Sequence, residues 1–131
     1  TCAVQKGQKK SLLRDQKPYT RLADHIGNFP IVLMDPQDTD LVRDSSDTRR
    51  RFFDGVMAQL DRTFLDNLIR YNRIVQQRNS LLKQFADSGQ IDAVMLASYH
   101  EPLVILGEAI NQAQIERLQL LRLGFHYLSQ R

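Results

Sequence analysis

The sequence predicts an α+β fold that is mainly α, with a short β-hairpin region followed by a long antiparallel helical hairpin. Three observations predict it. Short apolar runs broken by glycine and proline fill the first third of the chain, and apolar residues recur at steps of three and four through the rest. A Ser-Gly pair at 88–89 divides that second stretch in two. With 131 residues, 42% of them hydrophobic, the chain is long enough for one domain of ordinary size.

The first elements are expected to be a β-hairpin. Residues 1–5 and 11–14 flank a turn centred on Gly7, because glycine adopts the backbone conformations that tight turns need. Lys17-Pro18 is expected to break the second strand, because proline has no backbone N–H to donate.

A short helix and a buried strand are expected next. Thr20 can cap a helix over residues 21–26, which Gly27-Asn28 would end. Pro30 then opens the run 31–34, Ile-Val-Leu-Met, whose unbroken apolar character is typical of a strand buried on both faces. Such a strand needs layers above and below it, which the preceding residues are too few to supply. The chain is therefore expected to be a piece of a longer protein.

The remainder is expected to form two long helices. Residues 44–46, Asp-Ser-Ser, offer N-cap candidates for a helix over about 46–87, along one face of which the apolar residues recur. Ser88-Gly89 ends it, and a second helix follows over about 91–128. Pro102 is expected to kink this second helix or make it start afresh, because it removes one backbone hydrogen bond.

Composition argues against several classes of function. Cys2 is the single cysteine, so no intrachain disulfide can form and a reducing, cytoplasmic location is expected. The three histidines lack the spacing of metal ligands, and no nucleophile motif of the G-x-S-x-G type occurs. There is no G-x-x-x-x-G-K-[ST] phosphate-binding loop, and no apolar run approaches the roughly 20 residues that span a bilayer. We expect no metal site, no catalytic residues and no membrane contact.

Charge alternates along the chain although the net charge is only +3. Residues 1–20 and 48–87 each carry a net +4, whereas residues 21–47 carry −4 and residues 88–131 carry −1. A basic, acidic, basic order is compatible with nucleic-acid contact by the first and third blocks. A mixed, solvated surface is the alternative.

An arginine cluster, Arg49 to Arg51, lies in the first turn of the expected helix over 46–87. Positive charge there opposes the helix dipole by about 0.3–1 kcal/mol per residue, so an anion is expected nearby. Neighbouring aspartates can supply it structurally, and the phosphates of a nucleotide or of DNA can supply it functionally. Arg49 and Arg50 are therefore candidate anion contacts, with both alternatives open.

Residues 70–83, RYNRIVQQRNSLLK, form a second basic stretch that is almost free of acid. Its spacing suggests one broad helical face bearing Arg70, Arg73, Arg78 and Lys83. Guanidinium and amide groups donate hydrogen bonds without competing negative charge, which suits a phosphate backbone. The alternative is a solvated face with polar pairs four residues apart.

Two motifs can be followed through these stretches in order. In the first, Pro36 follows the apolar run, Leu41-Val42 supplies two aliphatic residues, and Arg49-Arg50 precede Phe52-Phe53 and Asp54. The second has the form Tyr-x-x-x-aliphatic-x-Gln-Arg-Asn-x-Leu-Leu, and its matching residues are Tyr71, Val75, Gln77, Arg78, Asn79, Leu81 and Leu82.

With these motifs the chain resembles the RecF family, the bacterial recombination-repair ATPases related to SMC and ABC-type ATPases. The resemblance covers roughly residues 6–121. The chain departs from the family pattern at Gln37, where an acid is usual, and at Asp44-Ser45, where small Gly-type residues are usual. These departures concern the geometry of the loop before the first long helix.

The resemblance implies a place for each part of the chain. Residues 1–43 would be the end of the first ATPase lobe, and residues 44–131 the helical subdomain inserted between the two halves of an ATPase. The loop at Gln37 and Asp38 would lie toward the nucleotide. The chain itself would hold no cofactor and hydrolyse no ATP, since it lacks the Walker A, signature and Walker B motifs.

The resemblance also implies a function for the complete protein. It would bind ATP and Mg²⁺, form a homodimer, bind DNA at single-strand gaps, and work with RecO and RecR to load RecA. The alternative is a free-standing helical interaction module that binds a partner through its heptad face, Leu96, Tyr99, Leu103, Leu106, Ile110 and Ala113.

Overall fold

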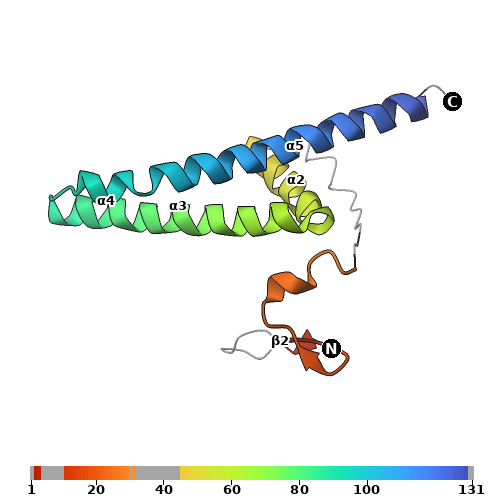
Figure 1. Cartoon of the computed structure of the whole chain (residues 1–131), viewed down its shortest axis with the longest axis horizontal. Helices are drawn as coiled ribbons and strands as arrows, with labels where there is room; N and C mark the ends of the chain where they lie inside the picture. The colour runs from red at the N-terminus through yellow and green to blue at the C-terminus, as the bar shows by residue number, and fades with distance from the viewer. Residues whose placement is uncertain (1, 4–10, 30, 32–44, 130–131) are drawn as a thin grey trace. The chain divides into compact units, whose positions relative to one another are not determined.

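The computed structural model describes residues 2–3, 11–29, 31 and 45–129, and its elements confirm a mainly α fold with a small antiparallel sheet (Figure 1). The elements in chain order are β1 (Cys2–Ala3), β2 (Ser11–Arg14), β3 (Lys17–Pro18), the 3₁₀ helix η1 (Leu22–His25), α2 (Ser46–Leu60), α3 (Arg62–Ser88), α4 (Ala93–Ala97) and α5 (His100–Ser129).

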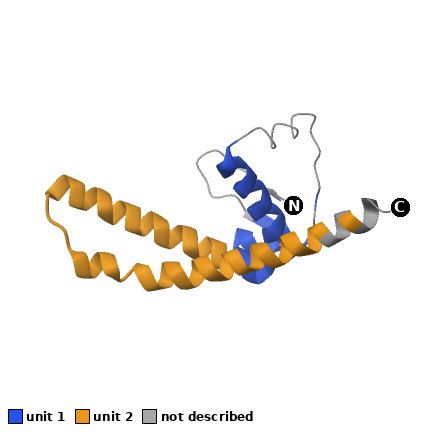
Figure 2. Ribbon diagram, turned by 90° about the horizontal axis from the view of Figure 1, so that it is seen from above, with its two compact units in different colours: residues 1–65 blue, residues 66–131 orange. Residues whose placement is uncertain are grey.

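The chain divides into two compact units, Thr1–Leu65 and Asp66–Arg131 (Figure 2). The division falls inside α3, so α2 and the first residues of α3 group with the β-rich segment. The expected strand beyond Ile31 and the loop that follows it lie outside the described residues. The assignment of residues 1–43 to an ATPase lobe and of 44–131 to a helical subdomain stays a prediction.

The sheet has three strands in the order β1-β2-β3, one more than the predicted hairpin. β1 pairs antiparallel with β2, as expected, with Cys2 opposite Leu12. The predicted break at Lys17-Pro18 is wrong, because these residues form β3 and pair with β2.

A tight turn at Asp15 and Gln16 makes the third strand possible. Both residues have positive φ, 50° and 64°, which is the conformation of the two-residue turns that match strand twist. Pro18 lies opposite Leu13, and the next hydrogen bond runs from the Tyr19 N–H to the Leu12 carbonyl at 2.9 Å. Pro18 therefore occupies a non-hydrogen-bonded position, where its missing N–H costs nothing.

The short helix after the sheet is a 3₁₀ helix, and its N-cap is Arg21 rather than the predicted Thr20. The Asp24 carboxylate accepts a hydrogen bond from the Arg21 backbone N–H at 3.3 Å, which satisfies a donor at the helix start. The helix ends at His25 with Ile26 as an extended C-cap, and Gly27 follows at φ +84° in the predicted Gly27-Asn28 turn. A Cβ at Gly27 would lie 2.6 Å from the Gln59 carbonyl oxygen, so the turn also packs closely on α2.

The single helix predicted over 46–87 is wrong, because the structure has two helices, α2 and α3, separated at Asp61. Asp61 has extended backbone angles, φ −133° and ψ 112°. Its N–H donates to the Met57 carbonyl at 2.8 Å and its carboxylate accepts from the Phe64 N–H at 3.0 Å. One residue thus ends α2 and caps α3. At the start of α2, Ser45 is the N-cap among the predicted candidates and accepts from the Thr48 N–H.

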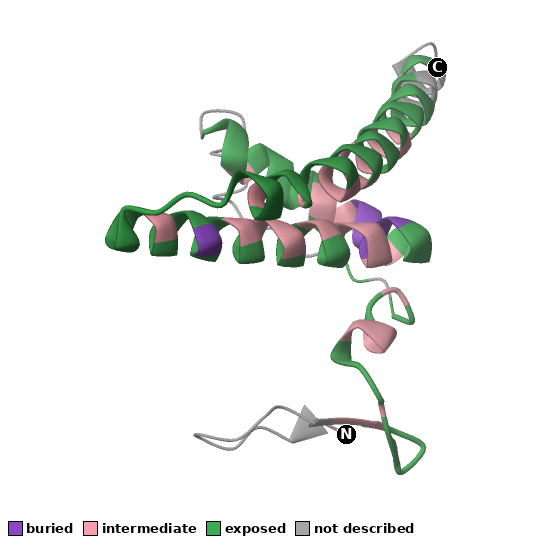
Figure 3. Ribbon diagram, turned by 60° about the vertical axis from the view of Figure 1, so that its left-hand side comes forward, coloured by how far each residue is buried: buried purple, intermediate pink, exposed green. Residues whose placement is uncertain are grey.

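The buried apolar residues of the first unit lie on either side of Asp61. Met57 and Ala58 on α2 are buried, and so are Phe64 and Leu65 on α3, with Phe64 only 2% exposed (Figure 3). The break at Asp61 therefore lies in the middle of the best-packed part of this unit.

The second predicted helix is also interrupted. Asp92 caps α4 by accepting from the Met95 N–H at 2.9 Å, and α4 ends at Ala97. α5 starts at His100, two residues before Pro102. Proline in the first turn of a helix loses no intrahelical bond, so the chain restarts there instead of kinking.

In the second unit, α3 and α5 run side by side in opposite directions (Figures 1 and 2). The two helices approach closely where Gly107 faces Tyr71, since a Cβ on Gly107 would lie 3.7 Å from the Tyr71 ring. Leu81 on α3 is buried, whereas α4 and α5 keep many apolar side chains exposed, Val94, Val104, Ile105, Leu118 and Leu121 among them.

One stretch of the described residues, Ala93–Arg122, is long and apolar enough to cross a membrane by length and composition. A single stretch of this kind is weak support for a span. It is not one continuous helix, because α4 ends at Ala97 and α5 begins at His100. It also carries the carboxylates of Glu101, Glu108 and Glu116. The expected lack of membrane contact stays a prediction.

Candidate nucleic-acid interface

The most distinctive polar surface of the second unit is a groove between α3 and the α4–α5 break. Its volume is about 560 Å³, and its lining residues are Arg73, Gln76, Gln77, Ser80, Leu81, Gln84, Met95 and Tyr99. None of these eight residues is acidic. The groove thus presents one cation, three amides and a hydroxyl, all of which can donate hydrogen bonds, beside an aromatic ring.

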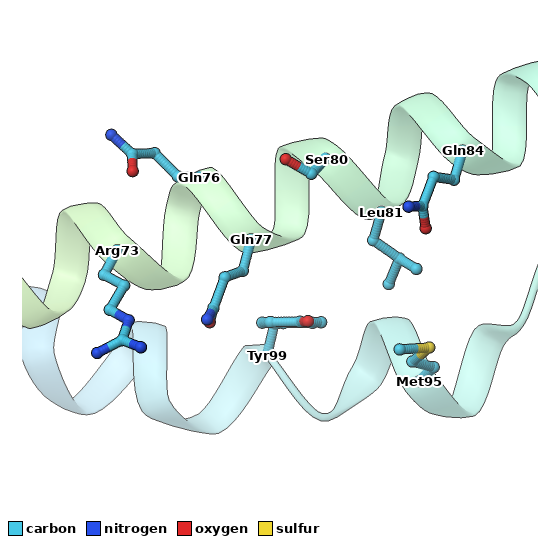
Figure 4. A pocket seen from close by; sticks show the side chains of 8 residues that line it. All are labelled: Arg73, Gln76, Gln77, Ser80, Leu81, Gln84, Met95 and Tyr99. Carbon is cyan, nitrogen blue, oxygen red and sulfur yellow. The ribbon is translucent and has the colours of Figure 1, made fainter. Parts of the chain in front are cut away.

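Side chains border the groove from both sides, although Gln76 points away from α5 (Figure 4). Arg73 and Gln77 point from α3 toward α5, and the Tyr99 ring lies edge-on to the viewer below Gln77 and Leu81. Tyr99 is half-buried and Arg73 is exposed. A charged donor and an aromatic ring therefore border the same open space.

A second groove of about 540 Å³ continues along the same helix pair. It is lined by Arg70, Arg73, Ile74, Gln77, Glu101, Pro102, Ile105 and Leu106. This groove is more apolar than the first and includes the Glu101 carboxylate. It is the poorer place for an anion, because that carboxylate repels one.

The structure separates the four basic residues that the sequence suggested would share one face of α3. At 3.6 residues per turn, Arg78 lies about 140° round the helix from Arg73, and Lys83 lies about 140° from Arg70. Arg70 and Arg73 line the grooves toward α5, whereas Arg78 and Lys83 do not. Arg70 and Arg73 therefore share one side of α3, with Arg78 and Lys83 lying farther round the helix, and the DNA-contact role of all four stays a prediction.

The arginine cluster of α2 keeps its charge close to solvent. Arg50 Nη1 lies 3.5 Å from Asp47 Oδ1, and both side chains are about two-thirds exposed, at 66% and 70%. Exposed pairs of this kind contribute little to stability. A neighbouring aspartate of the same helix therefore supplies one of the anions expected near the arginine cluster. Arg49 and Arg50 remain candidate contacts for a phosphate.

A separate charged network joins η1 to the start of α3 within the first unit. Asp24 accepts hydrogen bonds from the Arg21 side chain at 3.1 Å and from the Arg62 guanidinium. Arg62 also donates to the Ala23 carbonyl at 3.4 Å. Burial raises the pKa of Asp24, but the hydrogen bonds and charges of Arg62 and Arg21 outweigh it, so that the pKa of this carboxyl lies below its ordinary value.

The described part of the chain does not include the predicted nucleotide-proximal loop and contains no cluster of metal-ligating residues. Gln37 and Asp38, the predicted nucleotide-proximal residues, lie outside the described residues. Among the residues that the structure does describe, no three His, Cys, Asp or Glu side chains gather where they could hold a metal ion.

Sequence reasoning missed the aromatic and amide members of the groove. Basic residues and aromatic residues are not interleaved along the chain, so no stacking surface was expected. Tyr99 instead lines the same groove as Arg73, and its place in the heptad pattern indicated only packing. A helical hairpin pairs residues at increasing sequence separation, and only the register of α4 and α5 on α3 shows which ones meet.

Comparison with known proteins identifies relatives over most of the chain. It is 47% identical over 115 residues to the DNA replication and repair protein RecF of Cytophaga hutchinsonii, a match that covers 88% of this chain and 30% of the relative. The RecF protein of Flavobacterium johnsoniae is 44% identical over 118 residues, covering 90% of this chain and 33% of the relative. The RecF protein of Bacteroides fragilis is 38% identical over 133 residues, covering 98% of this chain and 35% of the relative.

A solved structure has the same fold over 90% of this chain and 32% of its own length, with a TM-score of 0.82 and 22% identity. It is the recombination mediator protein RecF bound to ATPγS, in the RecFOR pathway. No protein-family model matches the chain. The chain spans about a third of the length of the curated relatives it matches.

Proposed function

The chain belongs to the RecF family, and we therefore propose that it is the part of a longer DNA replication and repair protein that carries a DNA-contacting helical hairpin. The observation that carries this proposal is the acid-free groove of α3, with Arg73 and three glutamines, in a chain whose relatives are repair proteins. Donors without competing carboxylates suit a phosphate backbone.

The basic residues have two roles in this proposal. Arg70 and Arg73 would contact phosphates along the grooves, and Arg78 and Lys83 would extend the positive field around α3. Arg49 and Arg50, at the start of α2, are further candidates for an anion contact. Charges spread round a helix attract DNA over a distance of about one Debye length, roughly 8 Å at physiological salt, without requiring one flat face.

The remaining activities belong to the complete protein. There we propose that ATP and Mg²⁺ bind with Gln37 and Asp38 near the nucleotide, and that two copies associate. We propose that the protein acts in the cytoplasm at single-strand gaps and works with RecO and RecR to load RecA. The RecFOR pathway and ATPγS named for the solved relative support this part of the proposal. The described residues contain no cluster that could hold a metal ion. We propose no catalytic role for the residues of this segment.

The test is a salt titration of DNA binding by the full-length protein. Arg70, Arg73 and Arg78 are changed together to Ala, and binding to gapped duplex DNA is followed by fluorescence anisotropy. We expect weaker binding at low salt and a shallower salt dependence, with the log–log slope reduced by about 0.9 for each phosphate that the variant no longer neutralises.

A control for the loss of an arginine away from the groove replaces Arg122, an exposed residue near the far end of α5, with Ala. This variant should keep the affinity and the slope of the unmodified protein. Unchanged binding by the triple variant across the whole titration would rule out α3 as a DNA-contacting surface.

A further inference from the structure

The groove between α3 and the α4–α5 break combines two features that a plain phosphate contact does not need. One is an aromatic ring, that of the half-buried Tyr99. The other is an apolar floor, formed by the buried Leu81 and by Met95. A phosphate alone gains nothing from an aromatic ring, so the lining suits a ligand with both an anionic part and a flat apolar part.

A nucleotide is a ligand with both parts. We propose that this groove binds single-stranded nucleic acid, with one base stacked against the Tyr99 ring and an adjacent phosphate held by Arg73. The proposal rests on the proposed DNA contact and adds the strand type and the residues that select it. Stacking on aromatic rings tolerates every base, since every base has a flat face.

The geometry favours a single strand over a duplex. In a duplex both faces of each base are covered by its neighbours, so a ring on a protein surface reaches only phosphates, sugars and groove edges. An unpaired strand can turn a base outward onto a ring. The groove holds about 560 Å³ of open space along the helix pair, which leaves room for a base together with part of its backbone.

Two side-chain amides in the groove can hydrogen-bond to a base. Gln77 and Gln84 lie on the groove side of α3, and in Figure 4 Gln77 points toward Tyr99 and Gln84 toward α4; each amide has one acceptor and two donors. Such groups can meet the polar edge of any base, because an amide can rotate to present either its oxygen or its nitrogen. The groove should therefore bind single strands with little sequence preference.

The experiment compares three labelled ligands on the full chain by fluorescence anisotropy: an oligothymidine, a duplex of equal length, and an equally long oligonucleotide without bases. Tyr99→Leu removes the ring but keeps an apolar side chain, and Tyr99→Phe keeps the ring. Arg73→Gln removes the charge in the groove. Arg122→Gln removes an equal charge from a residue that lies about 30 Å along α5 from its first residue, His100. Circular dichroism verifies that each variant remains helical.

The expected result separates the ring from the charge. Tyr99→Leu should weaken oligothymidine binding by about 5- to 150-fold and leave binding of the base-free strand and of the duplex unchanged. Tyr99→Phe should bind like the unmodified chain. Arg73→Gln should weaken binding to all three ligands, and Arg122→Gln to none of them.

A second measurement does not depend on any variant folding. An oligonucleotide that carries 5-iodouracil is irradiated on the unmodified chain, and the crosslinked tyrosine is identified by mass spectrometry. We expect the crosslink at Tyr99, with Tyr19 of the sheet region as the internal comparison. Excess thymidine monophosphate should fail to compete, and effective competition would point to a free nucleotide as the ligand and overturn the proposal.

Other outcomes also decide the question. If Tyr99→Leu binds oligothymidine as tightly as the unmodified chain does, or if the crosslink is found elsewhere, the groove is not a base-stacking site, while the proposed DNA contact stands. If an acidic peptide of equal charge binds the groove as tightly as oligothymidine, the site is a general anion site. If no DNA ligand binds at low salt, both proposals fail.

Discussion

Arg62, in the first turn of α3, donates a hydrogen bond to the Asp24 carboxylate of η1, which lies 38 residues earlier in the chain. Arg21 shares the same carboxylate from the N-terminal side of η1. One acid thus holds two arginines, and through Arg62 it fixes the 3₁₀ helix against the junction at which α2 ends and α3 begins. Breaking the pair should loosen the first unit without touching the groove of the second.

The Asp24 network makes stability depend on pH in a defined direction. The pKa of Asp24 is lower in the folded chain than its ordinary value of 3.8, so the folded state favours the ionised form. This contribution is fully present above the ordinary pKa and is lost as the pH falls through the folded pKa. We expect Asp24→Asn to lower the melting temperature at pH 7, and the difference from the unmodified chain to shrink below about pH 4.

The control for this prediction is Asp15→Asn. Asp15 is 92% exposed and lies 3.8 Å from Arg14 Nε, so its ion pair is fully solvated. Its melting temperature should match that of the unmodified chain at both pH values. A pH-independent difference for Asp24→Asn, measured by circular dichroism, would mean that the carboxylate charge does not stabilise the fold.

Two glycines of the first unit should respond in opposite ways to alanine. Gly27 has φ +84°, and a Cβ there would lie 2.6 Å from the Gln59 carbonyl oxygen. Gly27→Ala should therefore destabilise the chain by more than the roughly 1–2 kcal/mol of the left-handed conformation alone. Gly55 lies in the middle of α2 with open space around it, so Gly55→Ala should stabilise it by about 0.5–1 kcal/mol. Urea unfolding gives both values, and equal signs for the two variants would contradict the described turn.

Asp61 should matter as a cap rather than as a charge. Its carboxylate accepts from the Phe64 N–H, so Asp61→Ala is expected to cost about 0.5–2 kcal/mol in the free energy of unfolding. Asp61→Asn keeps an oxygen acceptor at the same place and should cost much less. If Asn and Ala were equally destabilising in urea titrations, the effect would come from the lost charge instead.

The exposed apolar residues of α5 should promote self-association. About half of each side chain is exposed at Val104, Ile105, Leu118 and Leu121. Exposed apolar surface of this kind favours association with another protein surface. We expect the 131-residue chain to form dimers or larger species at high concentration in sedimentation equilibrium. Leu118→Lys should shift the equilibrium toward monomer, whereas Gln119→Lys, which adds the same charge at an already polar exposed position, should not. A monomer at all concentrations would contradict the prediction.

The third strand and the interrupted helix show where local patterns misled. Lys17-Pro18 indicated the end of a strand, but Asp15 and Gln16 adopt positive φ and turn the chain back, with Pro18 at a position that needs no donor. The apolar repeat of the first long helix runs through Asp61 without a gap, so periodicity alone predicted one helix. The structure has two helices because Asp61 makes capping hydrogen bonds both to the end of α2 and to the start of α3.

The family resemblance was predictable because it rests on residues in order along the chain, and the relatives agree with it. The fold class was predictable for a similar reason, since helical periodicity and turn residues act within a few positions. The location of the basic residues on one stretch of α3 was also visible in the sequence. Which of them border the grooves was not, because that depends on where α4 and α5 pack against α3.

The sequence by itself determined the helical hairpin, the segment 44–46 that holds the N-cap of α2 and the acid-poor stretch of α3, since each depends on neighbours a few residues apart. Only the tertiary structure decided that Tyr99 lines the same groove as Arg73 and that Asp24 binds Arg62. Such relationships between residues 26 and 38 positions apart depend on where helices break and how they align. That alignment follows from packing of whole surfaces, which no short stretch of residues encodes.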